Sequence, residues 1–260
     1  MVRKTKFLTF LLLAFSWGAP QAIGQMVAVK KNLCATSFPS DARIEWTCAQ
    51  AANEKALADL GSRMLDVMRF NRIDRMHALR GAYLKIPVKL DDVIGFTPLP
   101  AKLDQAKGYP RYIFIDRSEE FLGAYEFGEL KFSLPVASGF GVSTPTGTFR
   151  ILGRDRWAAS TIYPIRGTNI PYPMHWGIKF HVTPRGVSLW LHSRDLPGYP
   201  ASHGCVGLYD EEMEQKFFNY PPDPQMMDSE RLYQWVFPEA DAETPREYPG
   251  GMDGILIEIK

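Results

Sequence analysis

One cysteine and one histidine in this 260-residue chain have the types and the setting of a nucleophile and its base. Cys205 directly follows Ser202-His203-Gly204, and His192-Ser193 stands a short loop upstream. A thiol is only a few per cent ionised at neutral pH and reacts as the thiolate, so it needs a neighbouring base. An imidazole, with an ordinary pKa of about 6.5, suits that role. We therefore predict that Cys205 is a covalent nucleophile and that His192 takes its proton.

The segments around these two residues predict that they lie side by side. Residues 187–191 have the composition of a strand that leads directly into His192. Residues 195–200 contain glycine and proline and are typical of a loop that reverses the chain direction. Gly204 would let the backbone approach a substrate closely, and its N–H and that of Cys205 are predicted to stabilise an oxyanion.

Two other interpretations of Cys205 remain open from the residues alone. A lone cysteine is often a small buried side chain with no chemical role. A zinc site made of His192, His203 and Cys205 is the second alternative, but the paired spacings of strong zinc motifs are absent. We predict no metal at this site.

The motif around the cysteine resembles a known family. Ser202-His203-Gly204-Cys205-Val206, preceded by a strand that ends in His192-Ser193, resembles the signature of the L,D-transpeptidases (the YkuD domain). Pro145-Thr-Gly-Thr-Phe149 is similar to that family's P-T-G-x-F segment, and the resemblance covers about residues 109–260. It implies a mostly β catalytic domain, a YkuD-like β-sandwich with short helices, that needs no metal or organic cofactor.

The resemblance also implies a thioester mechanism on peptidoglycan stem peptides. Cys205 would attack the third residue of a tetrapeptide stem and expel the terminal D-Ala, and the amine of a neighbouring stem would take the acyl group to form a cross-link. His192 would be the base and then the acid, and Ser193 would orient it through its backbone carbonyl. His203 would shape the pocket, and Ser202 is assigned to substrate binding. Many members of the family are acylated by carbapenems.

One position departs from the family pattern. The family usually has Arg or Asn two residues after the cysteine, and here that residue is Gly207. Two alternatives to cross-linking therefore stay open. The same Cys–His pair could hydrolyse stem peptides or cross-links as an L,D-carboxypeptidase or endopeptidase, or the chain could be a non-catalytic wall-binding protein.

The aromatic segment 170–176 precedes the predicted catalytic strand. Tyr172 and Trp176 have the character of side chains that contact a peptide, and the segment would then form a lid over the site. The alternative is an aromatic patch in the core. We predict that both residues bind substrate.

The first residues predict export. Arg3, Lys4 and Lys6 precede a short apolar run at 7–15, and small residues end a predicted secretory signal over residues 1–24. An uncleaved anchor is the alternative, but the run is well short of the ~20 residues that span a bilayer. We expect a protein of the periplasm or cell envelope, without an integral membrane span in the mature chain.

Cysteine usage agrees with export. Cys34 and Cys48 lie close together in the N-terminal region, and Cys205 stands alone downstream. An exported chain with three cysteines can pair two of them and leave one thiol free. We predict a Cys34–Cys48 disulfide, with two small buried thiols as the alternative.

The chain divides into three predicted parts: the signal over residues 1–24, a helical N-terminal region and linker over 25–107, and a catalytic domain over 108–260 with an insertion at about 219–250. Apolar residues at helical spacing predict a helical extension at about 40–83, with His77 on its surface or at a cap. This region carries no chemical motif and is a candidate for docking a protein partner.

Composition excludes some classes of function. The formal net charge is +1, and three of the positive charges lie in the predicted signal. A nucleic-acid partner would normally require a basic face, and anionic lipid would require a polybasic stretch. We therefore expect no nucleic-acid partner.

Overall fold

The computed structural model describes residues 32–51, 53–239 and 244–260. The predicted signal over residues 1–24 lies outside these described residues. Within them, no helix combines the length and the apolar character that crossing a membrane requires.

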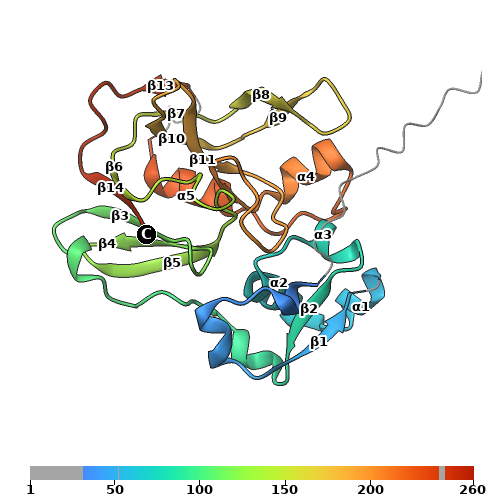
Figure 1. The fold of residues 1–260 in the computed structure, drawn as a ribbon. Coiled ribbons are helices and arrows are strands. Elements are labelled where there is room, and N and C mark those ends of the chain that lie inside the picture. The colour runs from blue at the N-terminus through green and yellow to red at the C-terminus, as the bar shows by residue number, and fades with distance from the viewer. Residues whose placement is uncertain (1–31, 52, 240–243) are drawn as a thin grey trace, which may run out of the picture.

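Two five-stranded sheets make up most of the fold (Figure 1). One has the strand order β12–β11–β10–β7–β13, and the other has the order β5–β4–β3–β14–β6. The first contains β7 (Gly153–Asp155), β10 (Gly177–Val182), β11 (Ser188–Ser193), β12 (Val206–Leu208) and β13 (Arg246–Glu247). The second contains β3 (Arg111–Asp116), β4 (Phe121–Glu126), β5 (Glu129–Pro135), β6 (Gly147–Phe149) and β14 (Ile255–Ile259).

The two sheets share one hydrophobic core. In β14, Ile255, Ile257 and Ile259 are buried and alternate with less buried residues, as expected of a strand with one face in a core. They meet side chains of the other sheet, including Ile178 of β10 and Leu191 of β11. The mostly β fold that the sequence predicts is therefore confirmed.

The strands that the sequence predicts with clear turn signals are present in the structure at the predicted positions. The strand predicted at 111–116 is β3, and those predicted at 121–127 and 130–136 are β4 and β5. Gly128 has a φ of +85° in the turn between β4 and β5, where a side chain would be strained. The catalytic and final strands are β11 and β14.

Two helices pack beside the sheets. Helix α4 (Glu211–Phe218) begins at Asp210, whose carboxylate accepts a hydrogen bond from the N–H of Met213 at 2.9 Å. Helix α5 (Asp228–Val236) lies inside the segment predicted as an insertion at 219–250. Its inner face contributes Leu232, Tyr233 and Val236 to the core that the two sheets share.

The N-terminal region is helical only in part of the predicted extension at 40–83. It contains short helices and a two-stranded sheet: α1 (Glu54–Ala58), α2 (Met64–Asn71), α3 (Arg75–Leu79), β1 (Trp46–Gln50) and β2 (Tyr83–Pro87). Gly61 (φ +57°) and Arg72 (φ +55°) adopt left-handed conformations between the helices, which breaks the continuous pattern. The helical pattern is also interrupted because β1 pairs with a strand more than 30 residues away.

The predicted linker packs on the second sheet. It contains short 3₁₀ turns at Leu90–Val93 and Asp104–Ala106. Leu99, Leu103 and Ala106 are buried against Tyr112 of β3 and Tyr125 of β4. This segment therefore covers the face of the sheet opposite the shared core. A further hairpin, β8 (Ala159–Pro164) and β9 (Pro171–Pro173), stands apart from both large sheets.

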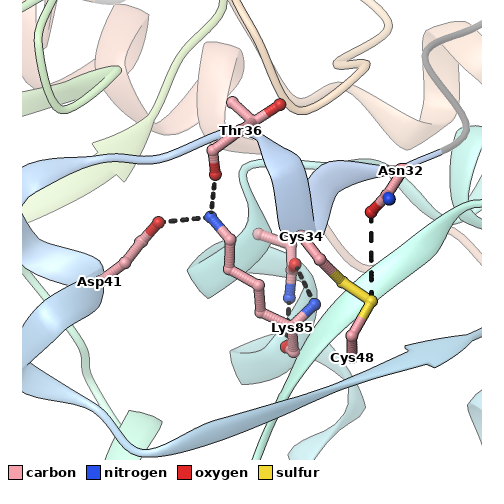
Figure 2. Close-up of a disulfide and its surroundings, with 7 residues drawn as sticks. Asn32, Cys34, Thr36, Asp41, Cys48 and Lys85 are labelled. Carbon is pink, nitrogen blue, oxygen red and sulfur yellow. Dashed lines mark hydrogen bonds and ion pairs between the residues drawn. A yellow bond between two sulfur atoms is a disulfide. The ribbon is translucent and has the colours of Figure 1, made fainter.

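A disulfide joins Cys34 and Cys48, whose Cα atoms are 5.9 Å apart (Figure 2). It connects the 3₁₀ turn Leu33–Ala35 to β1. Beside it, the Lys85 ammonium bonds to the Asp41 carboxylate and to the carbonyl of Thr36. Of the three cysteines, Cys205 is the free thiol.

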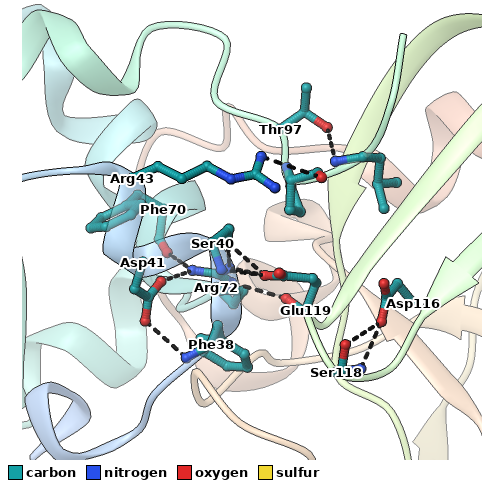
Figure 3. A network of polar contacts seen from close by, with 12 residues as sticks. Phe38, Ser40, Asp41, Arg43, Phe70, Arg72, Thr97, Asp116, Ser118 and Glu119 are labelled. Carbon is teal, nitrogen blue, oxygen red and sulfur yellow. Dashed lines mark hydrogen bonds and ion pairs between the residues drawn. The ribbon is translucent and has the colours of Figure 1, made fainter. Parts of the chain in front are cut away.

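A buried arginine attaches the N-terminal region to the second sheet (Figure 3). The guanidinium of Arg72, fully buried, lies 2.9 Å from Asp41 and 3.3 Å from Glu119, a residue of the β3–β4 turn. It also donates to Ser40 Oγ at 3.0 Å, and its carbon lies 4.0 Å from the centre of the Phe38 ring. Each charged group of this network has a partner of opposite sign, which offsets the cost of burial.

Replacing Arg72 by Met should lower the free energy of unfolding by about 3–5 kcal/mol, because Glu119 loses its buried countercharge and Asp41 keeps only that of Lys85. Urea unfolding of the oxidised protein measures this loss. The matched control is Arg43→Met, since Arg43 is exposed and reaches only the Pro98 carbonyl at 3.5 Å. The control should change stability by less than about 0.5 kcal/mol, and equal losses in the two variants would contradict the assigned role of Arg72.

Candidate active site

Strands β11 and β12 bring the predicted base and the predicted nucleophile to neighbouring strands at one cleft. The two strands run parallel, with His192 opposite Gly207 and Leu191 opposite Val206. Cys205 immediately precedes β12, and its sulfur accepts a hydrogen bond from the N–H of Trp190 at 3.4 Å. Both Cys205 and His192 line one cleft.

The environment of His192 selects one tautomer of its ring. His192 is buried, and its Nδ1 lies 2.6 Å from the carbonyl oxygen of Ser193. Because a carbonyl can only accept, Nδ1 carries the proton and Nε2 keeps its lone pair. Burial is the main cause that lowers the pKa of His192 to about 4; the charge of Arg194 acts in the same direction, and the Ser193 carbonyl and Asp195 oppose it. The ring is therefore neutral at pH 7 and has a free basic nitrogen.

Cys205 is a protonated thiol in the resting site. Burial raises the pKa of the Cys205 thiol, while the Trp190 N–H and the charge of Arg194 oppose that rise. A raised thiol pKa beside a lowered imidazole pKa means that the pair rests uncharged.

The turn before the nucleophile holds itself in place through Ser202. The N–H of Gly204 donates to Ser202 Oγ at 3.0 Å, and the Ser202 hydroxyl donates to the Cys205 carbonyl. The Gly204 N–H is thus bonded within the turn, and its role as an oxyanion donor stays a prediction. Gly204 has a φ of +136°, and a Cβ there would lie 2.9 Å from the Ser143 carbonyl. Only glycine fits this close approach.

A neighbouring loop supports the same turn. Thr144 Oγ1 donates to the Gly204 carbonyl at 3.0 Å and accepts from the N–H of Gly139 at 2.7 Å. Thr144 directly precedes the Pro145-Thr-Gly-Thr-Phe149 segment. The loop that leads into this segment therefore supports the turn before Cys205 through Thr144.

The cleft has a volume of about 1440 Å³ and is formed by four parts of the chain. They are α3 of the N-terminal region, the β8–β9 hairpin, the turn between β10 and β11, and the segment from His192 to Cys205. The β8–β9 hairpin supplies exposed apolar side chains, among them Ile162 and Tyr163. The described site is thus assembled from segments far apart in the sequence.

The structure separates the residues predicted to bind substrate. Tyr172, on β9, lines the cleft and its hydroxyl bonds to Asp195. Trp176 instead packs in the shared core, where its ring is 8% exposed and is not among the groups that line the cleft. For Trp176 the aromatic-core alternative is correct. His203 is exposed and stacks on Tyr163 of β8, with ring centroids 4.2 Å apart.

The zinc alternative finds no support in the geometry. Within residues 32–51, 53–239 and 244–260, no group of three or more His, Cys, Asp or Glu side chains is arranged to hold a metal ion. His192 already uses Nδ1 on the Ser193 carbonyl.

Sequence reasoning missed a polar cluster that the N-terminal region adds to the cleft. His77 was expected at the surface or at a cap, but its side chain is 6% exposed. Its Nδ1 lies 2.7 Å from Asp74, and its Nε2 lies 3.5 Å from Asp195. Asp74 also accepts from the N–H of Leu196 at 2.6 Å. The three-residue spacing of Asp74 and His77 is typical of a helix N-cap, so their contact could have been predicted from the sequence. The contact of His77 with Asp195 could not, because the two residues meet only in the folded chain.

Residues 110–237 match the family model of the L,D-transpeptidase catalytic domain (YkuD). Among solved structures, the chain is similar to an L,D-transpeptidase from Xylanimonas cellulosilytica, at 20% identity and a TM-score of 0.41 over 75% of this chain and 78% of that one. An L,D-transpeptidase from Mycobacterium smegmatis gives 18% identity and a TM-score of 0.36 over 58% of this chain and 59% of that one. The L,D-transpeptidase LdtMt1, solved in complex with imipenem, gives 19% identity and a TM-score of 0.35 over 58% of this chain and 59% of that one.

No curated protein sequence matches the chain. The chain spans about three fifths of the length of the M. smegmatis protein and of LdtMt1. The family assignment rests on the family-model match. Residues 110–237 of this chain belong to the L,D-transpeptidase catalytic domain family.

The uncharged state of the pair predicts how Cys205 reacts with iodoacetamide. The alkylation rate should keep rising with pH beyond the ordinary ionisation range of a thiol, because burial raises the pKa of Cys205. Mass spectrometry of unreduced protein measures the rate, and Cys205→Ser should take up no label because Cys34 and Cys48 are bonded. A plateau of fast alkylation at acidic pH would instead reveal a thiolate–imidazolium pair.

Replacing His77 by Gln should destabilise the protein more at about pH 6 than at about pH 9. Burial and Arg80 lower the pKa of His77, but Asp74 and Asp195 outweigh them and raise it above its ordinary value of 6.5. A raised pKa contributes stability that is complete below the unfolded-state value and is lost as the pH rises through the folded-state value.

Urea unfolding of wild type and His77→Gln at the two pH values measures this difference. Glu214 also faces Asp74 and Asp195, and burial raises the pKa of its carboxyl, so adding Glu214→Gln to both proteins serves as the control. The pH trend should persist when both proteins carry Glu214→Gln. A loss that is larger at the alkaline pH would contradict the charged state assigned to His77.

Proposed function

We propose that this chain is an exported peptidoglycan L,D-transpeptidase that forms cross-links through a thioester on Cys205. The observation that carries the proposal is the placement of the Cys205 sulfur beside β11, at whose end Ser193 fixes the tautomer of His192. The family assignment of residues 110–237 supports the same reaction class.

In the first half of the proposed reaction, the Cys205 thiol passes its proton to Nε2 of His192. The sulfur attacks the carbonyl carbon of the third residue of a tetrapeptide stem, and the carbonyl oxygen becomes an oxyanion. The Cys205 N–H is the donor we assign to it, since the Gly204 N–H is bonded to Ser202. The intermediate then collapses, the peptide bond to D-Ala breaks, and His192 protonates the departing amine. A thioester remains.

In the second half, the side-chain amine of another stem enters the cleft. It attacks the thioester carbon while Nε2 of His192 takes its proton, and the Cys205 sulfur leaves and regains a proton from His192. The new amide is the cross-link. Water in place of the amine would give the free tripeptide, which is the hydrolytic alternative.

The size and walls of the cleft suit a peptide donor and a peptide acceptor. Its volume of about 1440 Å³ exceeds the roughly 300–1,000 Å³ of ordinary small-molecule sites. The stacked pair of Tyr163 and His203 forms a wall of the same cleft as the nucleophile, and we assign it to holding the stem. Tyr172 adds a second aromatic side chain to the lining and is held there by its bond to Asp195.

Two further features support export and a drug-sensitive thiol. The Cys34–Cys48 disulfide fits an oxidising compartment such as the periplasm. LdtMt1, a structural neighbour, was solved in complex with imipenem. We propose that Cys205 of this chain also attacks the β-lactam carbonyl of carbapenems. The ring amide bond would break, and a thioester would form as it does with a stem peptide.

The decisive experiment incubates mature protein with a disaccharide tetrapeptide and follows the products by liquid chromatography and mass spectrometry. Cross-linked dimer is the expected product, with a transient protein adduct at Cys205. Tripeptide without dimer would indicate an L,D-carboxypeptidase, and unchanged substrate without an adduct would indicate a non-catalytic wall-binding protein.

Cys205→Ser should abolish both the dimer and the imipenem adduct while the protein stays folded. The activity should fall by at least about 10³-fold, as expected for the loss of a covalent nucleophile. Circular dichroism and the unfolding midpoint serve as the control for folding. An adduct that persists on Cys205→Ser would show that another residue is acylated.

A further inference from the structure

The side chain of Arg194 lies across Gly207. A Cβ built on Gly207 would stand 2.5 Å from both Cβ and Cδ of Arg194. Arg194 follows β11, and its N–H donates to the carbonyl of Leu208 at 2.9 Å, so the backbone holds it over this position. The glycine that departs from the family pattern therefore leaves no hole, because an arginine from the adjacent strand fills the space.

The guanidinium of Arg194 is only partly satisfied. Nη2 donates to the Ala201 carbonyl at 3.0 Å, while Nε is buried and meets no acceptor among the described residues. A buried donor without an acceptor costs about 1–3 kcal/mol, and since this Nε is itself buried, a ligand in the cleft can supply the acceptor only after the side chain shifts.

Arg194 acts electrostatically on the reacting groups. It lines the same cleft as Cys205 and His192. Its charge lowers the pKa of the Cys205 thiol and of the His192 ring, and it lowers the pKa of Asp195 as well. The guanidinium is therefore close enough to the nucleophile to interact with a substrate group next to the attacked bond.

The cleft as a whole favours an anion. Its charged lining comprises more cations than anions: Arg80, Arg166, Arg185 and Arg194 against Asp155 and Asp195. Asp195 is already bonded to the Tyr172 hydroxyl and lies beside His77. Of the four arginines, Arg166 and Arg185 are exposed, whereas Arg194 is half-buried next to the nucleophile.

We propose that Arg194 binds a free carboxylate of the donor stem peptide and so selects donors that carry one close to the scissile bond. An arginine fork matches a carboxylate with two parallel hydrogen bonds, and partial burial strengthens them. The terminal carboxylate of the donor lies one residue beyond the attacked carbonyl, within reach of a group beside Cys205. The identity of the donor rests on the proposed function, whereas the anion site itself does not.

The first test does not need peptidoglycan chemistry. Cys205 is alkylated with iodoacetate, which is anionic, and with iodoacetamide, which is neutral, and the ratio of the two rates is measured. Removing one positive charge near the sulfur in Arg194→Met should lower this ratio about fivefold. Arg194→Lys should keep most of it. An unchanged ratio in Arg194→Met overturns the anion site, because a purely structural change alters both rates alike.

A matched pair of variants separates charge from packing. Arg194→Ala should lower the ratio as Arg194→Met does, and it clears the space over Gly207. The double variant Arg194→Ala/Gly207→Arg returns a guanidinium to the same space from the other strand and should restore the ratio. A double variant with the low ratio of Arg194→Ala contradicts the proposal that the charge at this place is what matters.

The second test identifies the ligand. Wild type should react with a tetrapeptide donor with a free C-terminal carboxylate about tenfold faster, in kcat/KM for thioester formation, than with its C-terminal amide. In Arg194→Met that preference should vanish, mainly through KM. If wild type forms no thioester with either donor while the alkylation ratio still depends on Arg194, the proposed function fails and the anion site stands. Equal preferences in wild type and Arg194→Met overturn the selection of donors.

Discussion

In the parallel pair of β11 and β12, His192 stands opposite Gly207, and Cys205 enters the second strand beside Trp190. Parallel neighbours require a crossover, which in most proteins takes a dozen or more residues and usually contains a helix. Here the crossover, residues 194–205, has the usual minimum length but contains no helix. It is held from both sides: Asp74 binds the N–H of Leu196, and the carbonyl of Ser138 accepts from Ala201 and Ser202. The geometry of the site depends on these contacts.

Burial sets the chemical state of that pair. It raises the pKa of the Cys205 thiol and lowers the pKa of the His192 ring to about 4, so both rest uncharged. A protonated thiol is a weak nucleophile toward oxidants as well as substrates. If Cys205 is the nucleophile that we propose, this uncharged state would protect it in an oxidising compartment. Arg194 lines the same cleft, and its charge lowers the pKa of the thiol.

The sequence was informative where the signals are local. The block around Cys205, the strand before His192 and the hairpin at Gly128 all depend on neighbouring residues, and each lies as predicted. The helical extension is interrupted and shorter than predicted, because β1 pairs with β2 across the helices α1, α2 and α3. Two contacts arise only from tertiary structure and could not be predicted from spacing in the sequence. They are the contact of Asp195 with His77 and the packing of Arg194 over Gly207.

The buried ion pair of Arg72 and Glu119, here called the joint, limits where the chain can be truncated or exchanged with that of a relative. A fragment cut at residue 108 would expose the Glu119 side of that joint and would lack the wall of the cleft that α3 supplies. The start of the family-model match at residue 110 therefore does not coincide with a break in the packing of the chain. Chimeras that exchange the catalytic domain between relatives should carry their own N-terminal region with them, and substitutions on the two sides of the joint should be accepted only in compatible pairs.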